Sequence, residues 1–212
     1  GVRGCDNGFA DVTQAFDDAD DKPTCASTAG PAAIAVRFEG DLYNTIPISG
    51  GVMLPSDCLN QGVAATDTSA LGGSYSLIDS RFLGKIGASS GSPDLYCAGK
   101  GDGFASPQPL LQSVEDIQFT YGIADDASGR EVKFYTDAAG VDALAGTINE
   151  RWTRVITVRV CLLMRSEARN QADTDNYIDC AGDHKSADDG RMRRAFTSVY
   201  GLRNRSGFLT PS

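Results

Sequence analysis

Three stretches of the chain alternate apolar and polar residues with a period of two, which is typical of half-buried β-strands. They cover residues 113–123, 152–166 and 193–205 and read SVEDIQFTYGI, WTRVITVRVCLLMRS and RRAFTSVYGLRNR. Strands whose two faces differ in this way are common in antiparallel sheets with one buried and one solvated face. The pattern therefore predicts that the three stretches belong to a single antiparallel sheet.

One face of each predicted strand is apolar and is expected to be buried. The residues assigned to it are Ile117, Phe119, Tyr121 and Ile123, then Trp152, Ile156, Val158, Val160 and Leu162, then Met192, Phe196, Tyr200 and Leu202. The best helical pattern, at 141–149, is too short to cover such a face. We expect the Gly-rich segment 51–112 or another chain to close it, and an exposed apolar strip to remain unless a dimer hides it.

The rest of the chain carries weaker strand signals between Gly-, Ser- and Asp-rich segments. Short strands are predicted at 32–40, 74–79, 81–86 and 94–97, and a return strand at 131–135 that places Val132 and Phe134 on the core side. We predict one α+β domain over residues 1–212 with little helix. Residues 1–112 form its loop-rich part with short strands, and residues 113–205 form the core antiparallel sheet.

The six cysteines are best explained as disulfides that pin long loops to the sheet. They are Cys5, Cys25, Cys58, Cys97, Cys161 and Cys180. Zinc sites need cysteines or histidines at short spacings, and this chain has no such pairs and a single histidine. Six cysteines permit many pairings, and we favour nearest neighbours: Cys5–Cys25, Cys58–Cys97 and Cys161–Cys180. Disulfides indicate an oxidising compartment outside the cytoplasm.

The net charge of −9 argues against a protein that coats nucleic acid. The only basic stretch surrounds the third predicted strand and contains Arg191, Arg193, Arg194, Arg203 and Arg205. We favour the interpretation that these arginines pair with the acidic loops. The alternative is a contact surface for an acidic partner or for DNA phosphates.

No residue pattern indicates catalysis or a resident metal. The Asp-rich segments at 17–21 and 173–189 lack the spacing of a calcium-binding EF-hand loop. His184 lies between Asp183 and Lys185, where a solvated side chain is the expected state. Nucleophile, zinc-protease and Ser–His–Asp signatures are absent from the sequence. We therefore expect a structural or binding protein that is not an enzyme.

Several of these stretches also resemble one known family. The run SVEDIQFTYGI, the apolar spacing of 152–166, the ending RRAFTSVYGLRN and the opening GVRGC together resemble the PilW family, the minor pilins of bacterial type IV pili. The resemblance is specific at both ends and through 113–166. Residues 26–105 and 167–190 match only in being loop-rich and cysteine-bearing.

The resemblance implies a pilin-like globular head without catalytic residues, metal or cofactor. Its implied partners are other minor pilins, the major pilin and a large adhesin at the pilus tip. Such proteins carry a cleaved leader and an apolar N-terminal helix, which this sequence lacks. That helix anchors the subunit in the inner membrane of a Gram-negative envelope, with a periplasmic head, before the subunit enters the extracellular pilus. The helix is also expected to cover part of the buried face.

Two alternatives remain open at this point. The J-type minor pseudopilin of type II secretion is similar to PilW and would serve protein export. A surface module that binds DNA or acts as an adhesin would use the basic stretch. The leading hypothesis is a minor pilin that takes part in pilus initiation at the tip and supports twitching motility, adhesion or DNA uptake.

Overall fold

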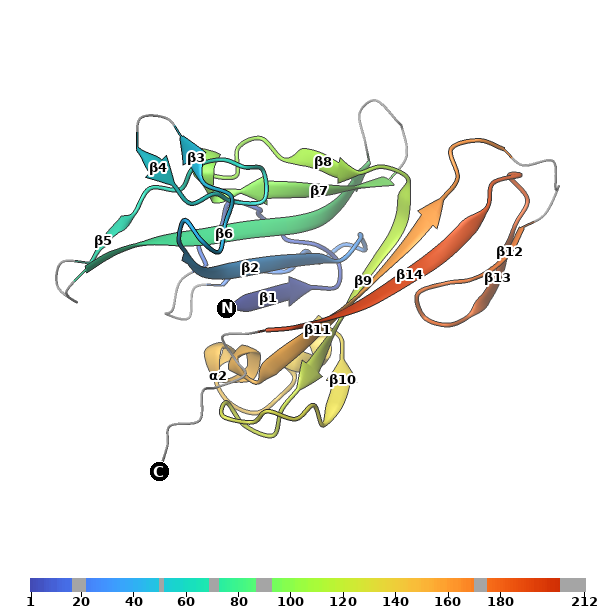
Figure 1. Ribbon diagram of the computed structural model, residues 1–212. Coiled ribbons are helices and arrows are strands. Elements are labelled where there is room, and N and C mark those ends of the chain that lie inside the picture. Colours follow the sequence, from blue (N-terminus) through green and yellow to red (C-terminus); the bar gives the residue numbers. More distant parts are fainter. Residues whose placement is uncertain (17–21, 50–51, 69–72, 87–92, 170–174, 203–212) are drawn as a thin grey trace.

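The computed structural model describes residues 1–16, 22–49, 52–68, 73–86, 93–169 and 175–202. Two antiparallel sheets dominate it, one from each half of the chain (Figure 1). The elements are β1 (Val2–Cys5), β2 (Ala33–Gly40), β3 (Ile48–Ser49), β4 (Met53–Leu54), β5 (Thr66–Thr68), β6 (Gly73–Ile86), β7 (Pro93–Gly99), η2 (Lys100–Asp102), β8 (Gln108–Leu111), β9 (Val114–Ile123), β10 (Phe134–Thr136), α1 (Ala138–Asp142), α2 (Ile148–Thr153), β11 (Val155–Arg165), β12 (Asp175–Ile178), β13 (His184–Ala187) and β14 (Arg193–Gly201). This content is consistent with the predicted α+β class.

The first sheet has the strand order β1-β2-β6-β7-β8, with β5 paired to the start of β6. The separate strands predicted at 74–79 and 81–86 are wrong, because β6 runs without a break through both. The polar residues in its middle have partners within the fold, so the strand continues through them. Arg81 is fully buried and forms an ion pair of 2.9 Å with Asp79. The Ser80 hydroxyl accepts a hydrogen bond from the backbone N–H of Cys58.

The second sheet has the order β10-β9-β11-β14 and confirms that the three alternating stretches pair in one antiparallel sheet. Its register aligns the predicted apolar faces across the strands. Ile117 lies opposite Leu162, which lies opposite Phe196. Tyr121 lies opposite Val158, which lies opposite Tyr200.

Three details of this half differ from the predictions. Trp152 does not open the long strand but lies in α2, and β11 begins at Val155. The single helix predicted at 141–149 is instead two short helices separated by a turn. Asp137 caps the first helix, and Thr147 forms a capping box with Glu150 that begins the second. The return strand β10 is shifted to later residues, and Phe134 is exposed rather than in the core.

The main core lies where the two sheets meet. Val2 and Ile34 of the first sheet join Ile117 and Tyr121 of the second in one buried cluster. Phe82 belongs to the same packing but is only partly buried. The prediction that the segment 51–112 covers the apolar face of the second sheet is therefore right only in part, since β1 and β2 supply the deepest contacts.

Three disulfides join Cys5 to Cys25, Cys58 to Cys97 and Cys161 to Cys180, which is the nearest-neighbour pairing. The third ties the small β12–β13 hairpin to β11. The hairpin contacts β14 near the beginning of that strand (Figure 1). Within the described ranges, no helix is long and apolar enough to span a membrane.

Candidate interaction surface

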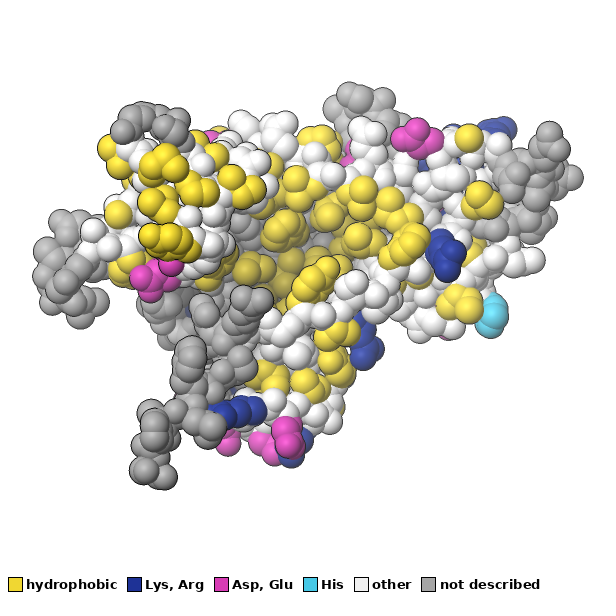
Figure 2. Space-filling model, in the orientation of Figure 1, with side chains coloured by type: hydrophobic (Ala, Val, Ile, Leu, Met, Phe, Trp, Pro, Cys, Tyr) yellow, Lys and Arg dark blue, Asp and Glu magenta, His cyan; other side chains and the backbone are white. Residues whose placement is uncertain are grey.

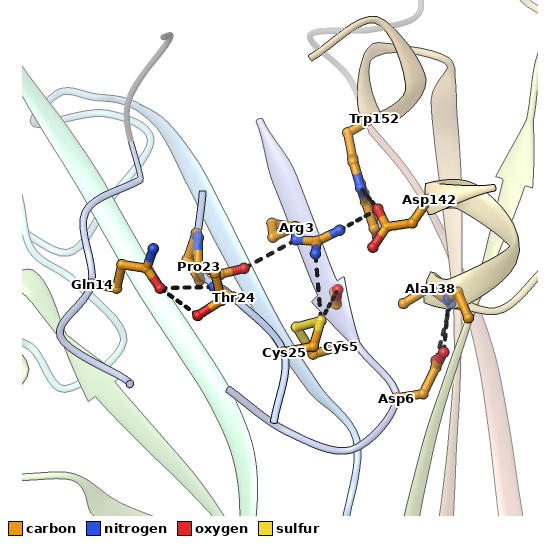
Figure 3. The surroundings of a disulfide bond; sticks show 12 residues. Arg3, Cys5, Asp6, Gln14, Pro23, Thr24, Cys25, Ala138, Asp142 and Trp152 are labelled. Carbon is orange, nitrogen blue, oxygen red and sulfur yellow. Dashed lines mark hydrogen bonds and ion pairs between the residues drawn. A yellow bond between two sulfur atoms is a disulfide. The ribbon is translucent and has the colours of Figure 1, made fainter. Parts of the chain in front are cut away.

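The two sheets are joined by a buried polar junction between β1 and the two helices (Figure 3). The Arg3 guanidinium is almost fully buried and forms an ion pair of 2.5 Å with Asp142. The same Asp142 oxygen accepts a hydrogen bond of 2.8 Å from the indole nitrogen of Trp152, and Arg3 stacks over the Trp152 ring. Asp6 accepts hydrogen bonds from the first two backbone N–H groups of α1. These contacts fix the orientation of the second sheet.

Tyr121 of β9 is buried against this junction. Its ring meets Trp152 edge to face, with a centroid distance of 4.9 Å. Burial, reinforced by the nearby Asp6 carboxylate, raises the pKa of the Tyr121 hydroxyl well above its ordinary value. The close contact between Tyr121 and β1 requires a glycine on β1, because a Cβ at Gly4 would lie 1.7 Å from the Tyr121 hydroxyl oxygen. This end of the second sheet is closed and well packed.

The β14 side of the same apolar face is open. Val160, Leu162 and Met164 of β11 are only partly buried, and Phe196 and Tyr200 of β14 are exposed. We call these five residues the apolar strip. Figure 2 shows hydrophobic side chains gathered in the hollow between the first sheet and β9, β11 and β14. The expected exposed strip is therefore present.

The first sheet contributes a second wall to this hollow. Val36, Phe82 and Leu95 are partly buried against the core. Leu111 of β8 lies opposite Leu95 and is exposed. An apolar surface of this kind, rimmed by polar residues, is a feature of interaction sites on soluble proteins.

The arginines of the predicted basic stretch have different surroundings. Arg193 forms a pair of hydrogen bonds with each of Glu115 and Asp189. The Arg193 guanidinium holds the pKa of the Asp189 carboxyl well below its usual range. Arg191 donates to the backbone oxygens of Ser166 and Glu167. Arg193 therefore pairs with acidic side chains, as the favoured interpretation expects, whereas Arg191 binds backbone oxygens.

Arg194 differs, because its side chain is exposed beside Phe196, with 5.8 Å from the guanidinium carbon to the ring centroid. Arg203 and Arg205 lie outside the described residues. Among the described residues, Arg191, Arg193 and Arg194 therefore do not form one free cationic patch. A role in contacting DNA or an acidic partner stays a prediction.

The acidic insertion after β11 forms the β12–β13 hairpin where it is described. Asp179 accepts backbone hydrogen bonds from Ala181 and Asp183, which lower its pKa and close the turn between the strands. His184 is exposed, as expected for a solvated side chain. Over the described ranges, no group of three or more His, Cys, Asp or Glu side chains is arranged to hold a metal ion.

Two functional features were missed from the sequence. The junction of Arg3, Asp142 and Trp152 brings together residues far apart in the chain, and no local pattern signals it. The edge position of β14 was also not predicted. The run AFTSVYG has strand character, but nothing in it separates an edge strand from a covered strand.

A comparison with protein-family models found a match. The model described as PilW, type IV pilus-assembly protein W, matches residues 85–204. Those residues run from the end of β6 through β14 and include the apolar strip. Comparisons with curated proteins and with solved structures found no match.

Proposed function

We propose that this chain, which belongs to the PilW family of type IV pilus-assembly proteins, is a non-enzymatic minor pilin that helps to initiate pili. Membership in the family places the protein in type IV pilus assembly and associates it with the cell envelope and pilus. The apolar strip carries the finer proposal, because a subunit that works by assembly needs an exposed apolar surface for other subunits.

The partners and location follow from the family resemblance. We propose that the head is periplasmic before assembly, anchored in the inner membrane by an apolar N-terminal helix, and later lies at the pilus tip. Other minor pilins, the major pilin and a large tip adhesin are the proposed partners. The hollow beside the apolar strip supports this, since an apolar helix or the apolar face of a neighbouring subunit would bury it.

Disulfides suit this location. Cys5–Cys25 fixes the N-terminal segment beside the junction, and Cys161–Cys180 fixes the hairpin beside β14. Such links stabilise a small head outside the cell, where thiols are not kept reduced.

Deletion of the gene tests the proposal. We expect loss of surface pili and twitching motility, restored by the wild-type gene, with normal export of type II secretion substrates. Loss of secretion with normal pili would instead identify the protein as a minor pseudopilin. Unchanged pili and unchanged secretion would contradict both assignments and direct attention to binding of DNA or another surface ligand.

A further inference from the structure

The outer edge of β14 presents unpaired backbone groups. Leu202 N–H donates to the Ile156 carbonyl at 2.8 Å, and the Met192 carbonyl accepts from Ser166 N–H at 2.9 Å. The register with β11 has no shift between these points, so even-numbered residues of β14 face β11. The N–H and C=O groups of the odd-numbered residues therefore point outward. Those of Ala195, Thr197, Val199 and Gly201 have no hydrogen-bond partner among the described residues.

Over residues 195–201 this edge lacks the sequence devices that protect natural sheet edges. Such edges are kept short or carry charges, prolines or bulges that prevent pairing with another chain. The edge strand of the first sheet, β8, has four residues, contains Pro109 and has a shifted register with β7. β14 is longer, and its segment 195–201 contains no proline and no charged residue. Phe196, Val199 and Tyr200 are nevertheless exposed.

No described strand pairs with this edge. A cleft separates β14 from the β12–β13 hairpin and is lined by Tyr177, Ile178 and Gly182 on one side and by Arg194 and Thr197 on the other. The hairpin contacts the beginning of β14 without pairing with it. Among the described residues, the edge along 195–201 is therefore a candidate site for pairing with another strand.

We propose that β14 pairs antiparallel with β14 of a second copy of this chain, around a two-fold axis at Ser198. In this register Phe196 of each copy lies opposite Tyr200 of the other, and Thr197 lies opposite Val199. The outward backbone groups then form about eight hydrogen bonds between the copies. Aromatic pairs placed directly opposite one another across antiparallel strands stabilise such pairing.

The sequence of β14 favours a second copy as the occupant, because one strand supplies both halves of each pair. Arg194 lies opposite Leu202 of the other copy, so no two arginines face each other. The pairing also extends the apolar row Tyr121–Val158–Tyr200 of one copy onto the row Phe196–Leu162–Ile117 of the other. Moving the axis by one residue to Thr197 would pair Phe196 with Ser198 and lose the aromatic contacts.

Engineered cysteines test both the pairing and the register. At Ser198 the two copies meet in a non-hydrogen-bonded pair with Cα atoms about 4.5 Å apart, which a disulfide can bridge. We expect purified Ser198→Cys to form a covalent dimer of twice 22.3 kDa under mild oxidation. The matched variant Thr197→Cys places its thiol opposite Val199 and is expected to cross-link at least about tenfold more slowly. Peptide mapping confirms that the bond joins the two engineered cysteines.

A second variant tests whether dimer formation can be lost without misfolding. Val199→Pro removes an outward N–H without touching the bonds to β11, and proline is tolerated on a strand edge in this orientation. We expect it to keep the wild-type circular dichroism spectrum and to sediment as a monomer where the wild type forms dimers. A Ser198→Cys chain that stays monomeric overturns the proposal, as does equally fast cross-linking by Thr197→Cys. Wild-type sedimentation as a monomer at all concentrations would also overturn it. These outcomes do not depend on the phenotype of the gene deletion.

Discussion

The strands β9 and β14 flank β11 on its two sides and have the same alternation of apolar and polar residues. The apolar side chains of β9 are nevertheless buried, whereas those of β14 are exposed. On β9, Ile117 and Tyr121 are 2% and 1% exposed. Their counterparts across β11, Phe196 and Tyr200, are 54% and 59% exposed. The first sheet and the Arg3 junction cover β9 and do not reach β14. Apolar side chains on one face of one sheet therefore serve stability at one side and are available for association at the other.

The largest expected effect is the contrast between two tyrosines in the same cross-strand row. Tyr121→Ala removes a fully buried ring and leaves a cavity beside Trp152, so we expect the unfolding free energy to fall by about 3–5 kcal/mol. Tyr200→Ala removes an exposed ring and should cost less than about 1 kcal/mol. Urea denaturation with the disulfides intact measures both. Similar losses in the two variants would contradict the contrast between the strands.

The junction that covers β9 should also be sensitive. Asp142→Ala leaves the buried Arg3 guanidinium and the Trp152 indole N–H without their shared acceptor. We expect a loss of about 2–3 kcal/mol, below the range for fully buried pairs because the Asp142 side chain is 34% exposed. Asp189→Ala is the control near β14, since Arg193 keeps its bonds to Glu115. A smaller loss for Asp142→Ala than for Asp189→Ala would show that the junction does not hold the sheets together.

Alkaline pH offers a third way to distinguish the buried tyrosine of β9 from the exposed tyrosine of β14. Burial raises the pKa of Tyr121 in the folded state, so the unfolded chain releases this proton first as the pH rises. The Tyr121 hydroxyl makes its full contribution to the unfolding free energy below the pKa of the unfolded chain, about 10. Above this pH the unfolding free energy falls by up to about 1.4 kcal/mol per pH unit. Tyr121→Phe should remove this part of the decline, and Tyr200→Phe should not. Identical alkaline unfolding curves for wild type and Tyr121→Phe would count against the burial of this hydroxyl.

The smallest effects are expected among the arginines at the start of β14. Arg193→Ala breaks the bonds to Glu115 and Asp189 and should cost about 1–2 kcal/mol. Arg194→Ala removes an exposed side chain and should change the unfolding free energy by no more than about 0.5 kcal/mol. Thermal unfolding of the two variants measures the difference in their stability. A larger effect at Arg194 would assign it a structural role that its surroundings do not show.

Alternation in the sequence was sufficient to predict the second sheet and its apolar face. Period-two patterns report which side chains share a face, and this held for Ile117, Val158 and Tyr200 alike. The patterns do not report what covers that face, because the cover comes from residues distant in the chain. Val2 and Ile34 bury Ile117 and Tyr121, whereas no described segment buries Phe196 or Tyr200 to the same degree.

The first sheet was harder to predict because its polar residues find their ion-pair and hydrogen-bond partners inside the fold. Asp79, Ser80 and Arg81 suggest a break by their polarity, and only the ion pair and the Cys58 contact show why β6 continues. Trp152 was misplaced because the capping box of Thr147 and Glu150 begins a short helix that includes it. The nearest-neighbour disulfide pairing was only the favoured one of the many that six cysteines permit, and the structure confirms it.

The central claim is that the β14 part of the apolar strip serves pilus assembly and not folding. Its most direct test combines Phe196→Ser with Tyr200→Ser in the gene of a piliated strain, with Tyr43→Ser, a fully exposed tyrosine outside the strip, as control. We predict normal amounts of a folded, disulfide-bonded double variant and loss of surface pili, with normal pili for the control. Normal piliation by a stably produced double variant would contradict the account.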